Sequence, residues 1–244
     1  MTGTFINVGA ILAGTLVGWL IGSRLPVGLQ QRVLAGLGLV TLVLGVDLAL
    51  AWRDTSPLYV LGGVLLGGLV GEALGIEDRL ERLGDRIQER TNRRRAGFAS
   101  GDGDVAPSRV SEGFFTASLL FCVGPLAVIG SIQDGLTGDI EALATKSLLD
   151  GFASIALAAS LGWGVAISAV SVLIYQGAIT LGAGALDGVL AEGTDALNAL
   201  TSAGGVLIIG IALRLLDVKD VKVGNFLPAL LFAPVLVGVV SLFD

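Results

Sequence analysis

Long blocks of apolar residues alternate with short polar intervals along almost the whole chain of 244 residues. A helix needs about 20 mostly apolar residues to cross a bilayer, and it satisfies its own backbone hydrogen bonds there. The blocks are continuous and do not alternate apolar with polar positions, which argues against a membrane strand barrel. The pattern predicts an all-α membrane protein, a polytopic bundle of about seven or eight transmembrane helices. The predicted spans are 4–23, 34–51, 58–75, 114–131, 145–161, 164–186, 200–216 and 225–243.

Lysine and arginine residues in the loops between these spans set the expected orientation. The segment 76–112 holds eight arginines, and the turns 24–32 and 214–222 are also basic. The loops at the opposite ends of the spans hold one arginine among them, Arg53. Basic loops stay on the cytoplasmic side, and all three fall there only if the short, polar segment 145–161 also crosses. We therefore expect eight crossings of the plasma (inner) membrane, a cytoplasmic 76–112 segment and both termini outside.

This pattern divides the chain into four regions. Residues 1–75 hold the first three predicted transmembrane helices, and 76–112 is a cytoplasmic Arg-rich helix and linker. Residues 113–162 form a central hairpin with a polar motif, and 163–244 hold the last three helices. With eight crossings, the first three and last three spans run in opposite senses. That is the arrangement of an inverted repeat, here placed around a central broken-helix hairpin.

The composition fits a membrane protein and argues against other classes. Hydrophobic residues make up 53% of the chain and mean hydropathy is +0.84, so membrane lipids are the expected surroundings. The net charge of −6 argues against nucleic-acid binding, which needs a basic surface. Histidine is absent and Cys122 is the single cysteine, so we predict no metal site and no cofactor. Many of the 37 glycines recur four residues apart, which favours close helix packing, either within the chain or in a homo-oligomer.

The stretch GSIQDGLTGD, residues 130–139, places two carboxylates and an amide directly after an apolar block. Pro125 predicts a kink in the preceding span, and the glycines argue against a smooth helix through the stretch. Farther on, Asp139, Lys146 and Asp150 share one helix face. Lys146 and Asp150 are four residues apart and can form an ion pair. Charged side chains inside a membrane face a partner or water, so this pair should point into the bundle, as a functional site or as a neutralised pair that only joins helices.

Other polar residues surround this candidate site. Asp134 and Asp139 either lie near an outer mouth of the site or belong to a solvated loop, in which Asp139 caps the next helix. Asn7, Gln176 and Asn225 either line a cavity or form hydrogen bonds across helices, and the second role is favoured for each residue taken alone. The predicted substrate- or ion-binding residues are Asp150, Lys146, Asp134, Asp139, Ser131, Gln133, Ser147, Asn7 and Asn225.

Several long stretches resemble one prokaryotic family. They are GTFINVGAILAGTLVGWLIGSRLP (3–26), LFCVGPLAVIGSIQDGLTGD (120–139), KSLLDGFASIALAASLGWGV (146–165) and LTSAGGVLIIGIALRLLDVKDVKVGNFLPALL (200–231). Together they resemble the YdfK/YqgA-type family of prokaryotic membrane proteins over essentially the whole chain. That family is catalogued as a domain of unknown function. The resemblance therefore implies an integral inner-membrane protein and supplies no reaction.

The leading hypothesis is a small secondary transporter or ion-conducting protein. Its site would lie on the fourth and fifth predicted spans, where carboxylates bind a small ion or solute and Lys146 acts as an internal counter-ion. The alternative is a non-catalytic membrane scaffold or accessory subunit with a dry, fully paired central hairpin. A third hypothesis, an intramembrane aspartyl-type enzyme, needs two carboxylates in contact. The stretch GLTGD is one residue too long for the GxGD pattern of such proteases, and no Walker-type sequence is present. The sequence therefore predicts no enzyme.

Overall fold

The computed structural model describes residues 1–22, 26–79, 82, 110–122, 125–186 and 188–242. Within these residues every regular element is a helix, so the predicted all-α fold is confirmed. The long elements are α1 (Thr2–Gly22), α2 (Val27–Ala49), α3 (Pro57–Leu74), α5 (Val110–Cys122), α6 (Pro125–Leu136), α7 (Glu141–Leu161), α8 (Ser168–Leu181), α10 (Asp195–Leu215) and α11 (Ala229–Val240). Short turns of helix join them: η1 (Leu50–Asp54), η2 (Gly162–Ile167), α9 (Ala183–Leu186) and η3 (Val223–Phe226).

Six helical segments of the described chain are long and apolar enough to cross a membrane, or seven if α5 and α6 together form one span. The axes of α5 and α6 differ by 62°, and α6 begins at Pro125, so the predicted kink is confirmed. One of the six segments, Glu141–Leu181, has 41 residues and contains both α7 and α8. It folds back on itself at η2, where Gly162 has φ of +80°.

The packing of α1 shows this reversal directly. Gly3 lies against Leu143 and Gly22 lies against Ala159, so α1 and α7 run in parallel. Gly177 of α8 lies beside Met1, so α8 returns toward the start of α1. The predicted spans 145–161 and 164–186 are therefore two separate antiparallel helices.

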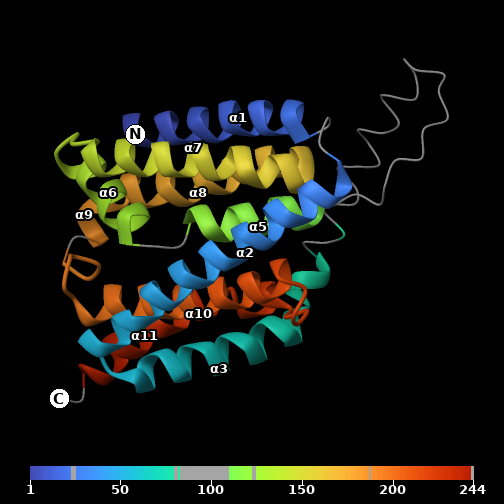
Figure 1. Ribbon diagram of the computed structural model, residues 1–244. Coiled ribbons are helices and arrows are strands. Elements are labelled where there is room, and N and C mark those ends of the chain that lie inside the picture. Colours follow the sequence, from blue (N-terminus) through green and yellow to red (C-terminus); the bar gives the residue numbers. More distant parts are fainter. Residues whose placement is uncertain (23–25, 80–81, 83–109, 123–124, 187, 243–244) are drawn as a thin grey trace.

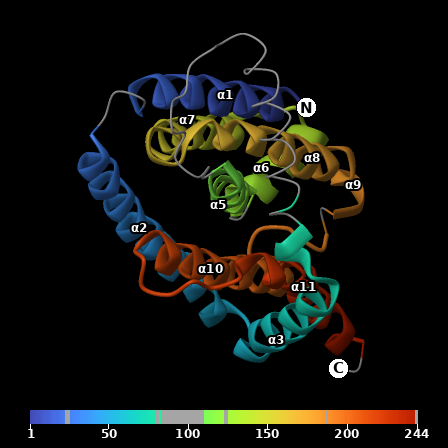
Figure 2. The same ribbon diagram turned by 90° about the vertical axis from the view of Figure 1, so that its right-hand side faces the viewer.

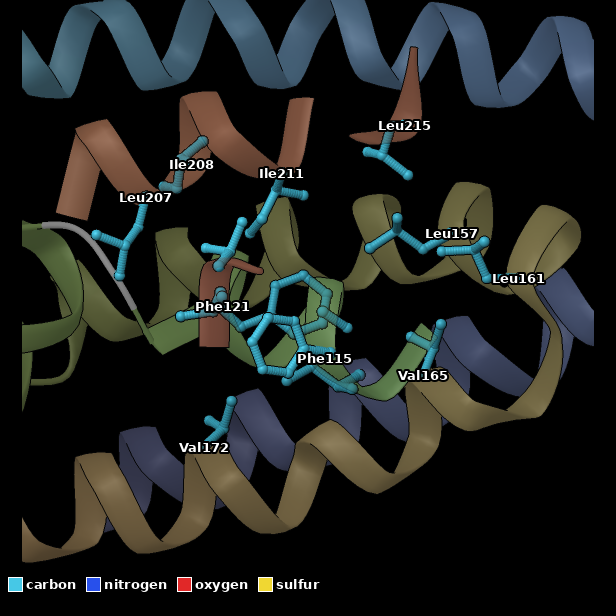
Figure 3. Close-up of a cluster of buried hydrophobic side chains, with 14 of the residues drawn as sticks. Phe115, Phe121, Leu157, Leu161, Val165, Val172, Leu207, Ile208, Ile211 and Leu215 are labelled. Carbon is cyan, nitrogen blue, oxygen red and sulfur yellow. The ribbon is translucent and has the colours of Figure 1, made fainter. Parts of the chain in front are cut away.

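The helices form two groups with α5 between them (Figures 1 and 2). One group contains α1, α6, α7 and α8, and the other contains α3, α10 and α11. Helix α2 runs obliquely along one side and packs on α10. Figure 3 shows how the groups meet: apolar side chains of α10 point toward side chains of α5 and α7. This core includes Phe115, Phe121, Leu157, Leu161, Leu207, Ile208, Ile211 and Leu215.

Glycines allow the closest helix contacts in both groups. A Cβ atom at Gly63 would lie 2.7 Å from Ala233, and one at Gly67 would overlap the backbone of Ala229, so α3 and α11 pack against each other and run antiparallel. Gly45 of α2 has the same role against α10. The small-residue faces that suggested a homo-oligomer are thus used within the chain, and a homo-oligomer stays a prediction.

The helix directions agree with the expectation that the first three spans and the last three spans run in opposite senses. Helix α8 runs antiparallel to α1, and α10 and α11 run antiparallel to α2 and α3. The inverted repeat itself stays a prediction, as do the four regional boundaries. Most of the predicted Arg-rich helix and linker lies outside the described residues.

The two ends of the bundle differ in charge. The Met1 end, on the left in Figure 1, contains the start of α1 and α7 and the end of α6 and α8. Acidic residues at this end include Asp134 and Asp139. The Arg214 end contains the last residues of α3 and α10, and there Arg214 and Lys222 form ion pairs with Glu77 and Asp78.

Candidate functional site

The charged pair predicted from the sequence is buried inside the first helix group. Lys146 Nζ donates a hydrogen bond to Asp150 Oδ2, and the two side chains form an i, i+4 ion pair on α7. Asn7 Nδ2 of α1 donates to the same carboxylate oxygen at 2.9 Å. Lys146 is 5% exposed, Asp150 is 7% exposed and Asn7 is fully buried. The predicted inward orientation of the pair is therefore confirmed.

Amphipathic spacing on α7 produces this orientation. Leu148, Leu149 and Phe152 are 66%, 60% and 71% exposed, so the opposite face of the helix forms an apolar surface suited to lipid. Asp150 comes nine residues after Glu141 in a helix of 21 residues, which places it about 14 Å along a helix about 31 Å long. The ion pair thus lies near mid-span, where a charge is costly unless it has a partner.

Asp134 lies close to this site but has different partners. Its Oδ2 accepts a hydrogen bond from the backbone N–H of Gly3 at 3.1 Å and lies 2.8 Å from the N-terminal amine of Met1. The Asp134 side chain is 2% exposed. Because Gly3 and Asn7 are four residues apart on α1, the two contacted carboxylates are separated by about one helical turn along this helix, about 6 Å. Each of these two carboxylates thus has its own cationic partner.

The remaining predicted residues of this region divide into buried and exposed positions. Ser131 and Ser147 are buried, and each hydroxyl donates to a carbonyl of its own helix, at Ala127 and Leu143. Gln133 is half-buried. Asp139 is exposed, and its Oδ1 accepts a hydrogen bond from the backbone N–H of Glu141 at 3.0 Å. Asp139 therefore lies in the exposed turn before α7, whose N-cap position is Ile140, and not inside the site.

The glycines of 130–139 were expected to argue against a smooth helix through this stretch, and the helix does end within it, at Leu136. Gly130 and Gly135 do not interrupt α6, which continues through both. A Cβ atom at Gly135 would overlap the carbonyl oxygen of Thr180. These two glycines permit close packing of α6, and the chain turns only afterwards, where Gly138 has φ of +75°.

Several buried polar atoms near the charge pair have no hydrogen-bond partner among the described residues. Five of them lie on α1 and α8 between the Met1 end and mid-span. An unpaired buried polar atom costs about 1–3 kcal/mol, so the five together would cost about 5–15 kcal/mol, which is as large as the whole stability of a typical domain. Buried water is the usual partner of such groups. The five atoms are Thr4 Oγ1, Asn7 Oδ1, Gln176 Nε2, Gln176 Oε1 and Thr180 Oγ1.

A second buried network, which the sequence analysis did not predict, lies at the Arg214 end. Glu77 is 3% exposed, and its carboxylate accepts hydrogen bonds from Arg214 Nη1 at 2.8 Å and from the backbone N–H of Gly224 at 2.5 Å. Asn225 joins the same network, because its Oδ1 accepts from the N–H of Glu77 and its Nδ2 donates to Glu72. Asn225 was predicted as a site residue with Asp150, and the structure instead places it in this separate network.

The family model for DUF554, described as a protein of unknown function, matches residues 2–238. The chain belongs to the DUF554 family. It is 31% identical over 245 residues to the uncharacterized membrane protein YdfK of Bacillus subtilis (strain 168), a match that covers 100% of this chain and 98% of that protein. It is 33% identical over 233 residues to the uncharacterized protein YqgA of Escherichia coli (strain K12), covering 95% and 94% of the two chains. No solved structure matches the chain.

This DUF554 chain also has an apolar cavity of about 370 Å³ between α5, α8 and the start of α11. The half-buried thiol of Cys122 lies in its wall. Its other lining residues are Phe114, Phe115, Ser118, Leu119, Ser171, Ile174, Tyr175, Leu227 and Leu230.

Metal binding finds no support in the side chains of the described residues. Within this part of the chain, no group of three or more Cys, Asp or Glu side chains is placed to hold a metal ion. The arrangement around Asp150 contains one carboxylate, one ammonium group and amide and hydroxyl groups. Such a set can bind and release a proton or a monovalent cation at the carboxylate.

Proposed function

We propose that this protein transports a small monovalent cation or a proton across the membrane, with Asp150 as the binding carboxylate and Lys146 as its internal counter-ion. The observation that carries the proposal is the buried Lys146–Asp150 ion pair near mid-span, which shares Asp150 Oδ2 with Asn7. Ionisable residues inside membrane helices commonly mark ion pathways and proton relays.

In the proposed cycle, Lys146 and the transported cation compete for the same carboxylate. When the cation is absent, the ammonium group of Lys146 neutralises Asp150. When a cation or proton binds Asp150, Lys146 loses its partner and must move toward water or another acceptor. The protein would then alternate between two packing arrangements of α7 against α1. The close glycine contacts between these helices leave little space for arrangements between the two. The proposal includes no chemical reaction.

The partners of Asp150 support a site in preference to a purely structural pair. If the pair only joined helices, the polar atoms next to it would all have hydrogen-bond partners. Asn7 Oδ1 and Ser154 Oγ lie next to the pair and have no partner among the described residues. Both side chains are fully buried. Unpaired oxygen atoms beside an ion pair provide additional ligands for a bound cation or for water.

The proposed orientation places the Met1 end outside and the Arg214 end in the cytoplasm of a plasma-membrane protein. Described basic residues at the Arg214 end include Arg79, Arg214 and Lys222, and basic segments favour the cytoplasmic side. In this orientation α1, α2, α3, the α5–α6 pair, α7, α8, α10 and α11 each cross once. Transport would then connect the acidic outer end with the basic inner end.

A flux assay in proteoliposomes tests the proposal. Purified protein is reconstituted with a pH-, sodium- or potassium-sensitive dye inside, and the matching ion gradient is applied in each case. We expect the Asp150→Asn variant to lose ion flux while remaining folded. Its neutral amide has no negative charge for which a cation and Lys146 could compete. The exposed Asp139→Asn variant is the matched control and should transport normally. Normal flux through Asp150→Asn would refute the site, and no flux of any ion through the wild type would favour the scaffold alternative.

A further inference from the structure

Buried polar side chains continue from the Asp150 site to the Met1 end of the bundle. They lie on the facing sides of α1, α6 and α8, and all of them are at most 6% exposed. Starting from Asp150, the series comprises Asn7, Gln176, Thr4, Thr180 and Asp134.

Contacts between the helices place the residues of this series that lie farthest from Asp150 together at the Met1 end. Gly135, next to Asp134 on α6, lies against the Thr180 carbonyl of α8. Gly177, next to Gln176 on α8, lies beside the side chain of Met1. Asp134 also accepts a hydrogen bond from the N–H of Gly3, which precedes Thr4 on α1. The first turn of α1 and the last turns of α6 and α8 therefore enclose one polar zone.

The unpartnered atoms are concentrated in this zone. Gln176 is fully buried, and neither its amide nitrogen nor its amide oxygen has a partner among the described residues. The hydroxyls of Thr4 and Thr180 and the amide oxygen of Asn7 have none either. A buried glutamine with two unpaired atoms needs two or more hydrogen-bonding neighbours, and a line of water molecules would supply them.

The other half of the α1–α7 interface is closed. The unpartnered hydroxyls of Thr15 and Ser154 extend about one turn beyond Asp150. Past that point, Cβ atoms at Gly18 and Gly22 would overlap the backbone of Ile155 and Ala159 respectively, which leaves no space between the helices. On α1 and α7, Ser160 Oγ is the unpartnered atom beyond this point among the described residues, so the series of unpartnered polar atoms is denser toward the Met1 end.

We propose that these side chains line a single file of water that conducts protons between the Met1 end and Asp150. The inference rests on the proposed transport function and names the proton as the ion that reaches the site. A hydronium in the file would transfer its proton to Asp150, which becomes a neutral carboxylic acid, and the water molecule remains in the file. The ion pair with Lys146 then breaks.

The titratable groups around Asp150 come from several helices. Lys146 lies on the same helix, and Asp134 of α6 lies about one turn away along α1. Helix α1 contributes the uncharged Asn7. Lys146 is thus the immediate charged neighbour that a proton on Asp150 would release.

Accessibility of introduced cysteines to silver ions tests the water file independently of transport. In a Cys122→Ala background, cysteine is introduced at Gln176 or Thr180, with Val170→Cys on the exposed face of α8 as the matched control. Silver ions are added from the Met1 side, and remaining thiols are labelled with a maleimide after denaturation. We expect silver to protect positions 176 and 180 and to leave position 170 available for labelling.

A second variant keeps the test decisive if a cysteine variant does not fold. Gln176→Leu should remove the amide from the file and reduce proton flux to that of empty liposomes, whereas Ile174→Leu on the exposed face should conduct like the wild type. The file is refuted if silver protects neither 176 nor 180, or if Gln176→Leu conducts protons normally. Silver protection at 176 together with normal flux through Asp150→Asn would instead refute the proposed site and leave the water file standing.

Discussion

The Cα atom of Gly14 on α1 lies so close to the carbonyl oxygen of Gly151 on α7 that a methyl group on Gly14 would overlap it. Helices α1 and α7 run in parallel at this point, and Asp150 directly precedes Gly151. The glycine contact therefore fixes how far Asn7 on α1 can lie from the Asp150 carboxylate on α7.

Gly14→Ala should destabilise the protein, because the added methyl group would push α1 away from α7. Overpacking of this kind typically costs about 1–3 kcal/mol. The matched control is Gly9→Ala on the same helix, where the space around a Cβ atom is open. Thermal unfolding in detergent micelles should show a lower midpoint for Gly14→Ala and an unchanged or higher one for Gly9→Ala. Equal midpoints for the two variants would contradict the close contact between α1 and α7.

The Glu77 network should stabilise the Arg214 end. Glu77→Ala removes the acceptor for both Arg214 and the N–H of Gly224, and an unpaired buried donor costs about 1–3 kcal/mol. Asp78→Ala is the matched control, because Asp78 also pairs with a basic residue, Lys222, but both side chains are 57% exposed. An exposed pair contributes about 0–1 kcal/mol. Denaturant unfolding that showed equal losses for the two variants would overturn this interpretation.

The apolar cavity beside Cys122 should be detectable through its thiol, which is the single cysteine of the chain. We expect a neutral, lipophilic maleimide to label Cys122 in membranes, and a charged methanethiosulfonate to label it far more slowly, because the lining is mostly apolar. Ser171→Leu would fill the cavity and slow the labelling, whereas Val170→Leu, at an exposed neighbouring position, would not. Faster labelling by the charged reagent would show that the cavity opens to water.

Local patterns in the sequence were sufficient to predict the helices and the central ion pair. Apolar blocks of suitable length predicted the membrane helices, and Pro125 predicted the start of α6. Lys146 and Asp150 could be predicted as a pair because residues four apart lie on one face of a helix. These inferences depend on residues that are close in sequence, where helical geometry alone fixes the distance.

Contacts between distant residues could not be predicted in the same way. Asn7 and Asp150 are separated by 143 positions, and their hydrogen bond depends on the glycine contact between α1 and α7. Glu77 was expected in a charged surface helix, and its burial depends on η3 and the end of α10, 148 and 137 positions away at Asn225 and Arg214. Gln176 resembled a simple helix-joining residue, and only the structure shows that its amide has no partner among the described residues.

The two members of the central ion pair should not contribute independently to stability. Lys146→Met leaves the Asp150 carboxylate buried without its cationic partner, and breaking a buried pair in this way costs about 3–5 kcal/mol. Replacing both residues, as Lys146→Met with Asp150→Leu, removes the unpaired charge. Since an apolar pair of similar volume is often as stable as a buried ion pair, the double variant should recover most of the lost stability. Unfolding of both single variants and the double variant in detergent gives the coupling energy.

Flux through the double variant should stay at the level of empty liposomes, because it has no carboxylate to bind the ion. A stable double variant that still transports would show that the ion pair only joins helices, and a double variant less stable than Lys146→Met would show that the carboxylate is stabilised by groups other than the lysine.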